Sequence, residues 1–110
     1  MKNNQKHYRQ GDVLITSIKA LPKDKKAVAR EGGRLILAHG KSTGHNHAIA
    51  TAKCAMFASK AAPGSLFLQV TGARASLTHD EHSTIALPKG AYQVTRQREF
   101  SSAAVRRVED

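Results

Sequence analysis

Short apolar runs, separated at near-regular intervals by glycine and proline, constrain the fold of this chain more than any other feature. Within the runs, apolar and polar side chains tend to alternate, which is the period of a β-strand with one buried face. A helix-forming pattern is nearly absent before residue 101. The sequence therefore predicts an all-β fold, a small β-barrel or sandwich of about seven or eight short strands. These strands are expected over residues 13–18, 34–39, 45–51, 54–58, 65–70, 74–79, 85–87 and 92–100.

Glycine-containing links predict how neighbouring strands connect. Residues 71–72 and 88–90 each join two β-forming runs, so both are expected to be hairpin turns. If 88–90 is a three-residue turn, His82 lies beside Arg96, and Arg98 lies near Asp80. A bulge would shift this register by one residue and exchange the two faces.

The 110 residues are enough for one domain, which we expect to span 1–110. Residues 1–9 are expected to form a basic N-terminal arm, and 23–33 an exposed loop. Residues 101–110 are expected to form a tail that opens with a serine cap and a short helical turn.

Cysteine usage and hydropathy bear on the cellular compartment. The single cysteine, Cys54, allows no intrachain disulfide and favours a reducing cytoplasm. We expect it to be a small buried hydrophobic side chain rather than a nucleophile. No apolar run approaches the ~20 residues needed to cross a bilayer, and no secretory signal is recognisable. A cytoplasmic protein without a membrane partner is therefore expected.

Positive charge is abundant and unevenly placed. Eighteen Lys and Arg against eight Asp and Glu give a formal charge of +10. Nearly all of this excess lies before residue 61, where twelve basic residues face three acidic ones. Such a surface favours nucleic acid or a nucleotide as partner, although many small proteins are simply basic. Pairing of chains through exposed strand edges is a further possibility. The expected phosphate contacts are Lys23, Lys25, Lys26, Arg34, Lys41, Arg96 and Arg98; solvation of the lysine-rich loop is the alternative.

Histidine clustering is the strongest chemical signal. Five of the six histidines fall in two short stretches, 39–47 and 79–82. Histidine is the commonest protein ligand of transition metals and also serves in acid–base catalysis. His45 and His47 are spaced so that both rings share one face of an extended strand. We expect three of the following to hold a divalent metal, Zn²⁺ or Mn²⁺, at one end of the barrel: His39, His45, His47, His79 and His82.

Charged residues beside the second stretch complete a hypothetical active site. Arg96 and Arg98 would clamp a phosphate, and Asp80 or Glu81 would accept a proton, orient a histidine ring or ligate the metal. The alternative is that the histidines form structural hydrogen bonds, Asp80 and Glu81 are solvated, and the two arginines pair with acidic residues on the surface. His7 is expected to be inert.

Two family resemblances arise at these residues. Gly44-His45-Asn46-His47 resembles the first metal motif of the cupin family, which implies a metal on a barrel strand; no carboxylate follows within residues 48–52 as it does in cupins. Separately, the chain resembles a family of small bacterial and phage-borne proteins, a resemblance that implies no activity. The segments that carry it are Gln10-Gly-Asp-Val, Thr43-Gly-His-Asn-His, His79-Asp-Glu-His, Leu87-Pro-Lys-Gly-Ala-Tyr and Gln97-Arg-Glu-Phe.

Together these patterns predict a metal-dependent hydrolase of a phosphodiester, in RNA or a nucleotide. His47 and His79 would act in catalysis beside Asp80, Glu81 and the two arginines. One alternative is a non-catalytic module that binds nucleic acid or another partner and whose histidines are structural. A second is a metal-free ribonuclease in which two histidines act as acid and base on RNA.

Overall fold

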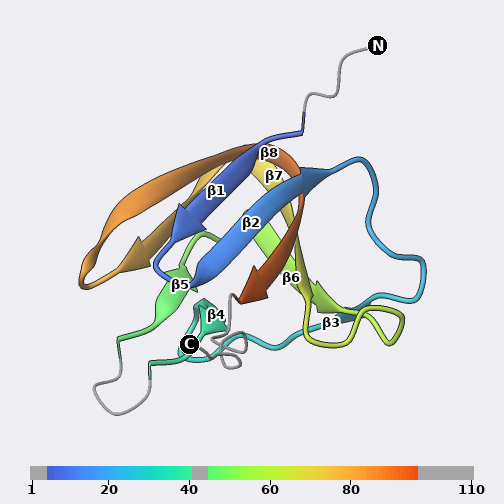
Figure 1. Ribbon diagram of the computed structural model, residues 1–110, viewed down its shortest axis with the longest axis horizontal. Coiled ribbons are helices and arrows are strands. Elements are labelled where there is room, and N and C mark those ends of the chain that lie inside the picture. The colour runs from blue at the N-terminus through green and yellow to red at the C-terminus, as the bar shows by residue number, and fades with distance from the viewer. Residues whose placement is uncertain (1–4, 41–44, 97–110) are drawn as a thin grey trace, which may run out of the picture.

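A computed structural model describes residues 5–40 and 45–96 of the chain (Figure 1). These residues form eight strands in one antiparallel sheet, and no helix is found among them. The all-β prediction is therefore confirmed, while the strand order shows an open path rather than a closed barrel. The strands are β1 (His7–Gln10), β2 (Val13–Ile18), β3 (Lys26–Ala27), β4 (Leu35–Ala38), β5 (His47–Ile49), β6 (Cys54–Ala58), β7 (Leu66–His79) and β8 (His82–Arg96).

The long hairpin of β7 and β8 organises the sheet. The main path of hydrogen-bonded strands runs β1-β2-β8-β7-β5-β4, and β6 with β3 branches from it. Both β5 and β6 pair with β7, β6 along residues 66–70 and β5 along residues 77–78. On the opposite flank, β2 pairs with the last part of β8, residues 91–96. The turn between β7 and β8 therefore lies near β5 and the β1–β2 turn (Figure 1). By contrast, β6 pairs with the other end of β7, and β3 pairs with β6.

The prediction of hairpin turns at residues 71–72 and 88–90 was wrong. Both links lie within long strands, where Val70 pairs with Gly90 and Arg74 with Pro88 across a register shift. The actual turn is at Asp80 and Glu81, so the ladder partner of His82 is His79 rather than Arg96. This part of β8 has no partner on its other side in the described ladder, so the N–H that Pro88 lacks is tolerated there.

The change of phase along these strands explains the error. In β7 the fully buried side chains are even-numbered at Leu68 and Val70, but odd-numbered at Ala75 and Leu77. β8 changes at the same level, from buried Leu87 to buried Tyr92 and Val94. A bulge exchanges the faces of a strand without ending it. In the sequence, a one-residue shift of the apolar alternation beside a glycine looks the same as a turn between two strands.

Two strands lie where the sequence predicted none. Residues 7–10 form β1 rather than an arm, because Gly11 adopts φ 60° and allows a two-residue turn into β2. Residues 26–27 form the short β3 against β6, within the segment expected to be a loop. The expected C-terminal turn lies outside the described residues. No helix among the described residues is long and apolar enough to span a membrane.

The core lies on the inner face of this bent sheet. Its largest fully buried apolar side chains come from β2, β4, β5, β7 and β8, and every residue of β4 is buried. Cys54 and Met56 of β6 also belong to the core, as expected for Cys54. Three polar residues are also buried among the described ones: Gln10, His47 and Ser59.

Candidate functional site

A polar cavity of about 290 Å³ opens where β1, β5 and the β7–β8 turn meet. All five histidines of the two predicted stretches line it, so the stretches do converge in space. The lining residues are Asp12, His39, Gly40, His45, His47, His79, Glu81, His82 and Arg96.

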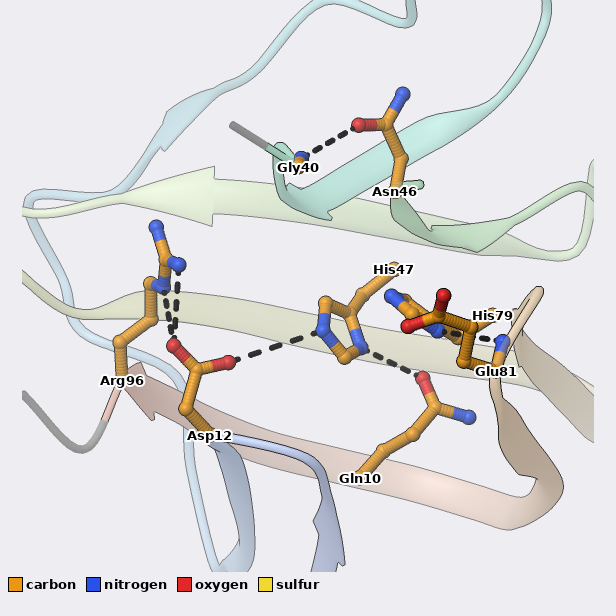
Figure 2. A network of polar contacts seen from close by, with 8 residues as sticks. All are labelled: Gln10, Asp12, Gly40, Asn46, His47, His79, Glu81 and Arg96. Carbon is orange, nitrogen blue, oxygen red and sulfur yellow. Dashed lines mark hydrogen bonds and ion pairs between the residues drawn. The ribbon is translucent and has the colours of Figure 1, made fainter. Parts of the chain in front are cut away.

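Gln10 is the buried support of this cavity (Figure 2). Its Nε2 donates to the carbonyl oxygens of Leu77 and Ser83, both at 2.9 Å. Because carbonyls only accept, these two bonds fix which end of the amide is nitrogen. The remaining Oε1 lies 2.8 Å from Nδ1 of His47 and must accept from it. His47 therefore carries its proton on Nδ1.

The tautomer of His47 determines what it offers to the cavity. With the proton on Nδ1, the Nε2 atom keeps an unshared electron pair. That atom faces Oδ1 of Asp12 at 3.8 Å, which is longer than a hydrogen bond. Burial, followed by the neighbouring charge of His79, lowers the pKa of His47 to about 4. The ring is consequently neutral at pH 7.

Asp12 is held from its other side by Arg96. Nη2 and Nε of Arg96 lie 3.0 and 3.3 Å from Oδ2 of Asp12. Partial burial opposes ionisation of Asp12, but the hydrogen bond and the charge of Arg96 hold its pKa below the usual value. Asp12 follows Gly11 in the β1–β2 turn, so the tight turn places a carboxylate at the cavity. Arg96 ends β8 and reaches the same point from the neighbouring strand.

Glycine at position 11 makes room for two of the rings. A Cβ there would lie 2.8 Å from Nε2 of His82 and 3.4 Å from Cε1 of His47. The ring of His82 lies stacked on that of His47, with centroids 6.0 Å apart. His82 is exposed, and no hydrogen bond to its ring is found among the described residues.

The β7–β8 turn places two more histidine rings at the cavity. The N–H of Glu81 donates to Nδ1 of His79 at 3.0 Å, so a neutral His79 carries its proton on Nε2. The centroid of His79 is 4.3 Å from that of His47 and 4.7 Å from that of His82. His45 lies between carboxylates, 3.5 Å from Asp80 and 3.3 Å from Glu81. Asp80 and Glu81 therefore contact histidines, one of the roles considered for them.

His39 and His45 differ from the expected arrangement. The last residue of β4 is Ala38, and the exposed ring of His39 bonds to both oxygens of Glu31 at 3.0 Å. His45 precedes β5, which begins at His47, so the His-x-His pair does not lie along one strand as the cupin resemblance implied.

Among the predicted phosphate contacts that the structure describes, only Arg96 lines the cavity. Lys23, Lys25 and Lys26 are exposed in and beside the segment that loops out between β2 and β3, at the opposite side of Figure 1 from the β7–β8 turn. Arg34 is exposed as well. Lys41 and Arg98 lie outside the described residues.

Within residues 5–40 and 45–96, no three His, Cys, Asp or Glu side chains stand close enough to form a ready-made metal site. Among the described residues that line the cavity, Nε2 of His47 and Oδ1 of Asp12 face each other as acceptors, and the ring of His82 has no hydrogen bond. His79 and Arg96 can donate hydrogen bonds. The cavity can thus receive a cation at one point and an anion beside it.

Gln10 and Asp12 were absent from the predicted site. Their signal in the sequence is Gln10-Gly-Asp, in which a glycine between two polar residues directly precedes an apolar strand. In the sequence this segment carries part of a family resemblance and directly precedes the strand expected at 13–18, and neither fact assigns a role to the two side chains. Reading it as a tight turn would have placed both side chains at one end of the sheet, but not against His47.

Comparison with known proteins gives the family but no activity. No curated protein and no solved structure matches the chain. One family model matches residues 9–97, which includes every described residue that lines the cavity. This agrees with the resemblance to a family without an assigned activity. Because the match covers most of the chain, the protein belongs to this family, which is described as a domain of unknown function, DUF8820.

Proposed function

We propose that the cavity binds a divalent metal ion, Zn²⁺ or Mn²⁺, and that the protein is a metal-dependent hydrolase of a phosphodiester in RNA or a nucleotide. The hydrogen bond from His47 to Gln10 carries the proposal. Metal-binding histidines almost always donate their other ring N–H to an oxygen acceptor, which fixes the tautomer and the ring orientation. His47 has this arrangement, with its unshared pair in a polar cavity.

His82 is the natural second ligand. Its exposed ring is stacked on His47 and has no hydrogen bond to another described residue that it would have to lose. His79 would first have to release the N–H of Glu81. His39 and His45 are already engaged by carboxylates.

The same cavity also offers groups for the substrate. A bound divalent ion supplies an activated water by lowering its pKa. Arg96, at the edge of the cavity, carries a planar guanidinium that suits two phosphate oxygens. His79 presents an N–H that can stabilise a developing negative charge. The overall charge of +10 favours a polyanionic substrate.

Acid–base catalysis by two histidines without a metal is the second candidate. It is supported by one observation, the opposite protonation of neighbouring rings: His47 accepts at Nε2, whereas His79 donates there. A general base works best when its pKa lies near the working pH, and the pKa of His47, about 4, is far below 7. The metal-dependent reaction therefore ranks first.

Metal binding and hydrolysis are tested separately. Protein made without a His-tag is freed of metal with EDTA, dialysed and titrated with Mn²⁺ and Zn²⁺ by calorimetry. His47→Ala should lose the binding, whereas His7→Ala should keep it, because His7 bonds to Thr16 outside the cavity. Labelled RNA, DNA and nucleotides are then incubated with each protein, with and without added metal.

Stoichiometric binding by wild type and by His7→Ala, loss in His47→Ala, and metal-dependent cleavage would support the proposal. Cleavage of RNA that persists in EDTA would replace it with the metal-free reaction. Metal binding without cleavage of any substrate, or nucleic-acid binding alone, would replace it with a binding module.

A further inference from the structure

The β1–β2 turn brings a third group to the point where His47 and His82 meet. The missing Cβ of Gly11 leaves a space bordered by Nε2 of His82 and Cε1 of His47. Asp12 follows in the chain and turns Oδ1 toward Nε2 of His47. One tight turn therefore places Gly11 beside the ring of His82 and the carboxylate of Asp12 toward that of His47, two rings that come from other parts of the sheet.

Asp12 and His47 face each other through two atoms that carry no hydrogen. Gln10 places the ring proton on Nδ1, so the ionised carboxylate and the unshared pair of Nε2 face each other across 3.8 Å. Two acceptors in this relation repel each other, and a positive ion between them would turn the repulsion into attraction. Donor atoms bound to one ion at 2.0–2.2 Å are about 3.0–3.4 Å apart, so Oδ1 of Asp12 and Nε2 of His47 would have to approach each other by less than about 1 Å. The ring of His82, whose centroid lies 6.0 Å from that of His47, would have to turn a nitrogen toward the same point.

Resting on the proposed metal-dependent function, we infer that Asp12 is the third metal ligand beside His47 and His82, and that Arg96 holds this carboxylate when no metal is bound. Two histidines and one carboxylate leave further coordination positions open, a set that suits divalent first-row metals. Asp12 thereby takes the place that the sequence assigned to another histidine.

The same geometry makes Arg96 a competitor of the metal ion for the carboxylate of Asp12. Its contacts at 3.0 and 3.3 Å both involve Oδ2, so they turn that oxygen away from His47. The pair is partly exposed, with side-chain exposures of 34% for Arg96 and 42% for Asp12, and such pairs are weak. Metal binding can therefore displace the guanidinium. Once released, Arg96 is free to bind a phosphate oxygen, so metal binding would prepare the site for substrate.

Four proteins test this inference by Mn²⁺ calorimetry: wild type, Asp12→Asn, Arg96→Gln and the double variant. Asp12→Asn should weaken binding at least tenfold. Arg96→Gln should tighten binding several-fold, because it removes the group that competes with the metal for the Asp12 carboxylate. The same substitution should have a smaller effect in the Asp12→Asn background, where no carboxylate is left to compete for. Glu81→Gln is the matched control: it removes another carboxylate of the cavity and should change the affinity less than twofold. Thermal melting in EDTA checks that each variant is folded.

An affinity of Asp12→Asn within twofold of wild type would overturn the inference, as would weaker binding by Arg96→Gln. A larger effect of Glu81→Gln than of Asp12→Asn would also overturn it. If wild type binds no Mn²⁺ or Zn²⁺, the proposed function itself fails. If wild type binds metal, His47→Ala does not, and Asp12→Asn still does, only the assignment of Asp12 fails.

Discussion

Gln10 accepts a hydrogen bond from Nδ1 of His47 at 2.8 Å, while its own Nε2 donates to two carbonyl oxygens. The amide thus joins β1 to β5 and to both sides of the β7–β8 turn. All of its hydrogen-bonding atoms are used in a nearly water-free position, since Gln10 is 2% exposed. One side chain therefore stabilises the fold at this end of the sheet and sets the chemistry of the histidine that the cavity exposes.

Gln10→Ala should destabilise the protein by roughly 2–4 kcal/mol, because it leaves the carbonyls of Leu77 and Ser83 and the ring N–H of His47 without this partner. Urea unfolding measures the change in the free energy of unfolding. Gln93→Ala serves as the control, since Gln93 is half-buried and makes one side-chain hydrogen bond, to Ser65. Equal losses in the two variants would contradict the role assigned to Gln10.

Gly11→Ala should cost more stability than Gly32→Ala. Both glycines have φ near +60°, where alanine is strained by about 1–2 kcal/mol. A Cβ at Gly32 meets nothing within 4 Å, whereas one at Gly11 meets Nε2 of His82 at 2.8 Å. The additional loss in Gly11→Ala therefore reports crowding in the cavity. It can be measured by thermal unfolding in EDTA, together with the NMR shifts of the His82 ring. Matching losses and an undisturbed His82 would show that the rings do not depend on this glycine.

Alkylation of Cys54 should show a thiol that ionises only at high pH. Burial raises its pKa from 9.0 to about 11, although the charge of Arg30 opposes the shift. In the native protein the thiolate fraction, and with it the rate, should keep rising about tenfold per pH unit between pH 9 and 10.5. In urea the rate should level off near pH 9. Because folding favours the neutral thiol, the free energy of unfolding should decrease as the pH rises above 9. Iodoacetamide labelling followed by mass spectrometry measures both rates, and circular dichroism checks that the native sample stays folded. A native rate that levels off at or below pH 9 would contradict the burial of the thiol.

Arg30→Ala should destabilise the loop between β5 and β6 and the protein as a whole, by about 1–3 kcal/mol. The guanidinium donates to the carbonyls of Thr51 and Cys54 at 2.8 and 2.7 Å, and to those of Gly33 and Ala50 at 3.1 and 3.5 Å. Arg34→Ala is the control with the same change of charge, because among the described residues Arg34 bonds only through its backbone. Urea unfolding compares the two. A loss in Arg34→Ala as large as that in Arg30→Ala would show that charge, rather than these carbonyl contacts, matters.

Local alternation in the sequence was enough to predict several strands, with β2 and β6 at their observed bounds. The prediction was wrong where the buried face changes phase, at Gly72 and Gly90, because a bulge and a turn both interrupt the alternation beside glycine. Clustered histidines suggested one site, but the sequence left open whether the two histidine stretches meet in space. Their individual contacts could not be predicted either, because the carboxylates that engage His39 and His45 lie in other segments of the chain.

By itself, the sequence determined the all-β class, the basic charge and the two histidine stretches, since these depend on composition and on neighbours a few residues apart. Only the tertiary structure decided that Gln10 supports His47, that Asp12 lies between His47 and Arg96, and that the lysine-rich segment lies away from the cavity. The physical reason is the range of these interactions. Gln10 and His47 are 37 residues apart and Asp12 and Arg96 are 84 apart, so no local pattern marks either pair.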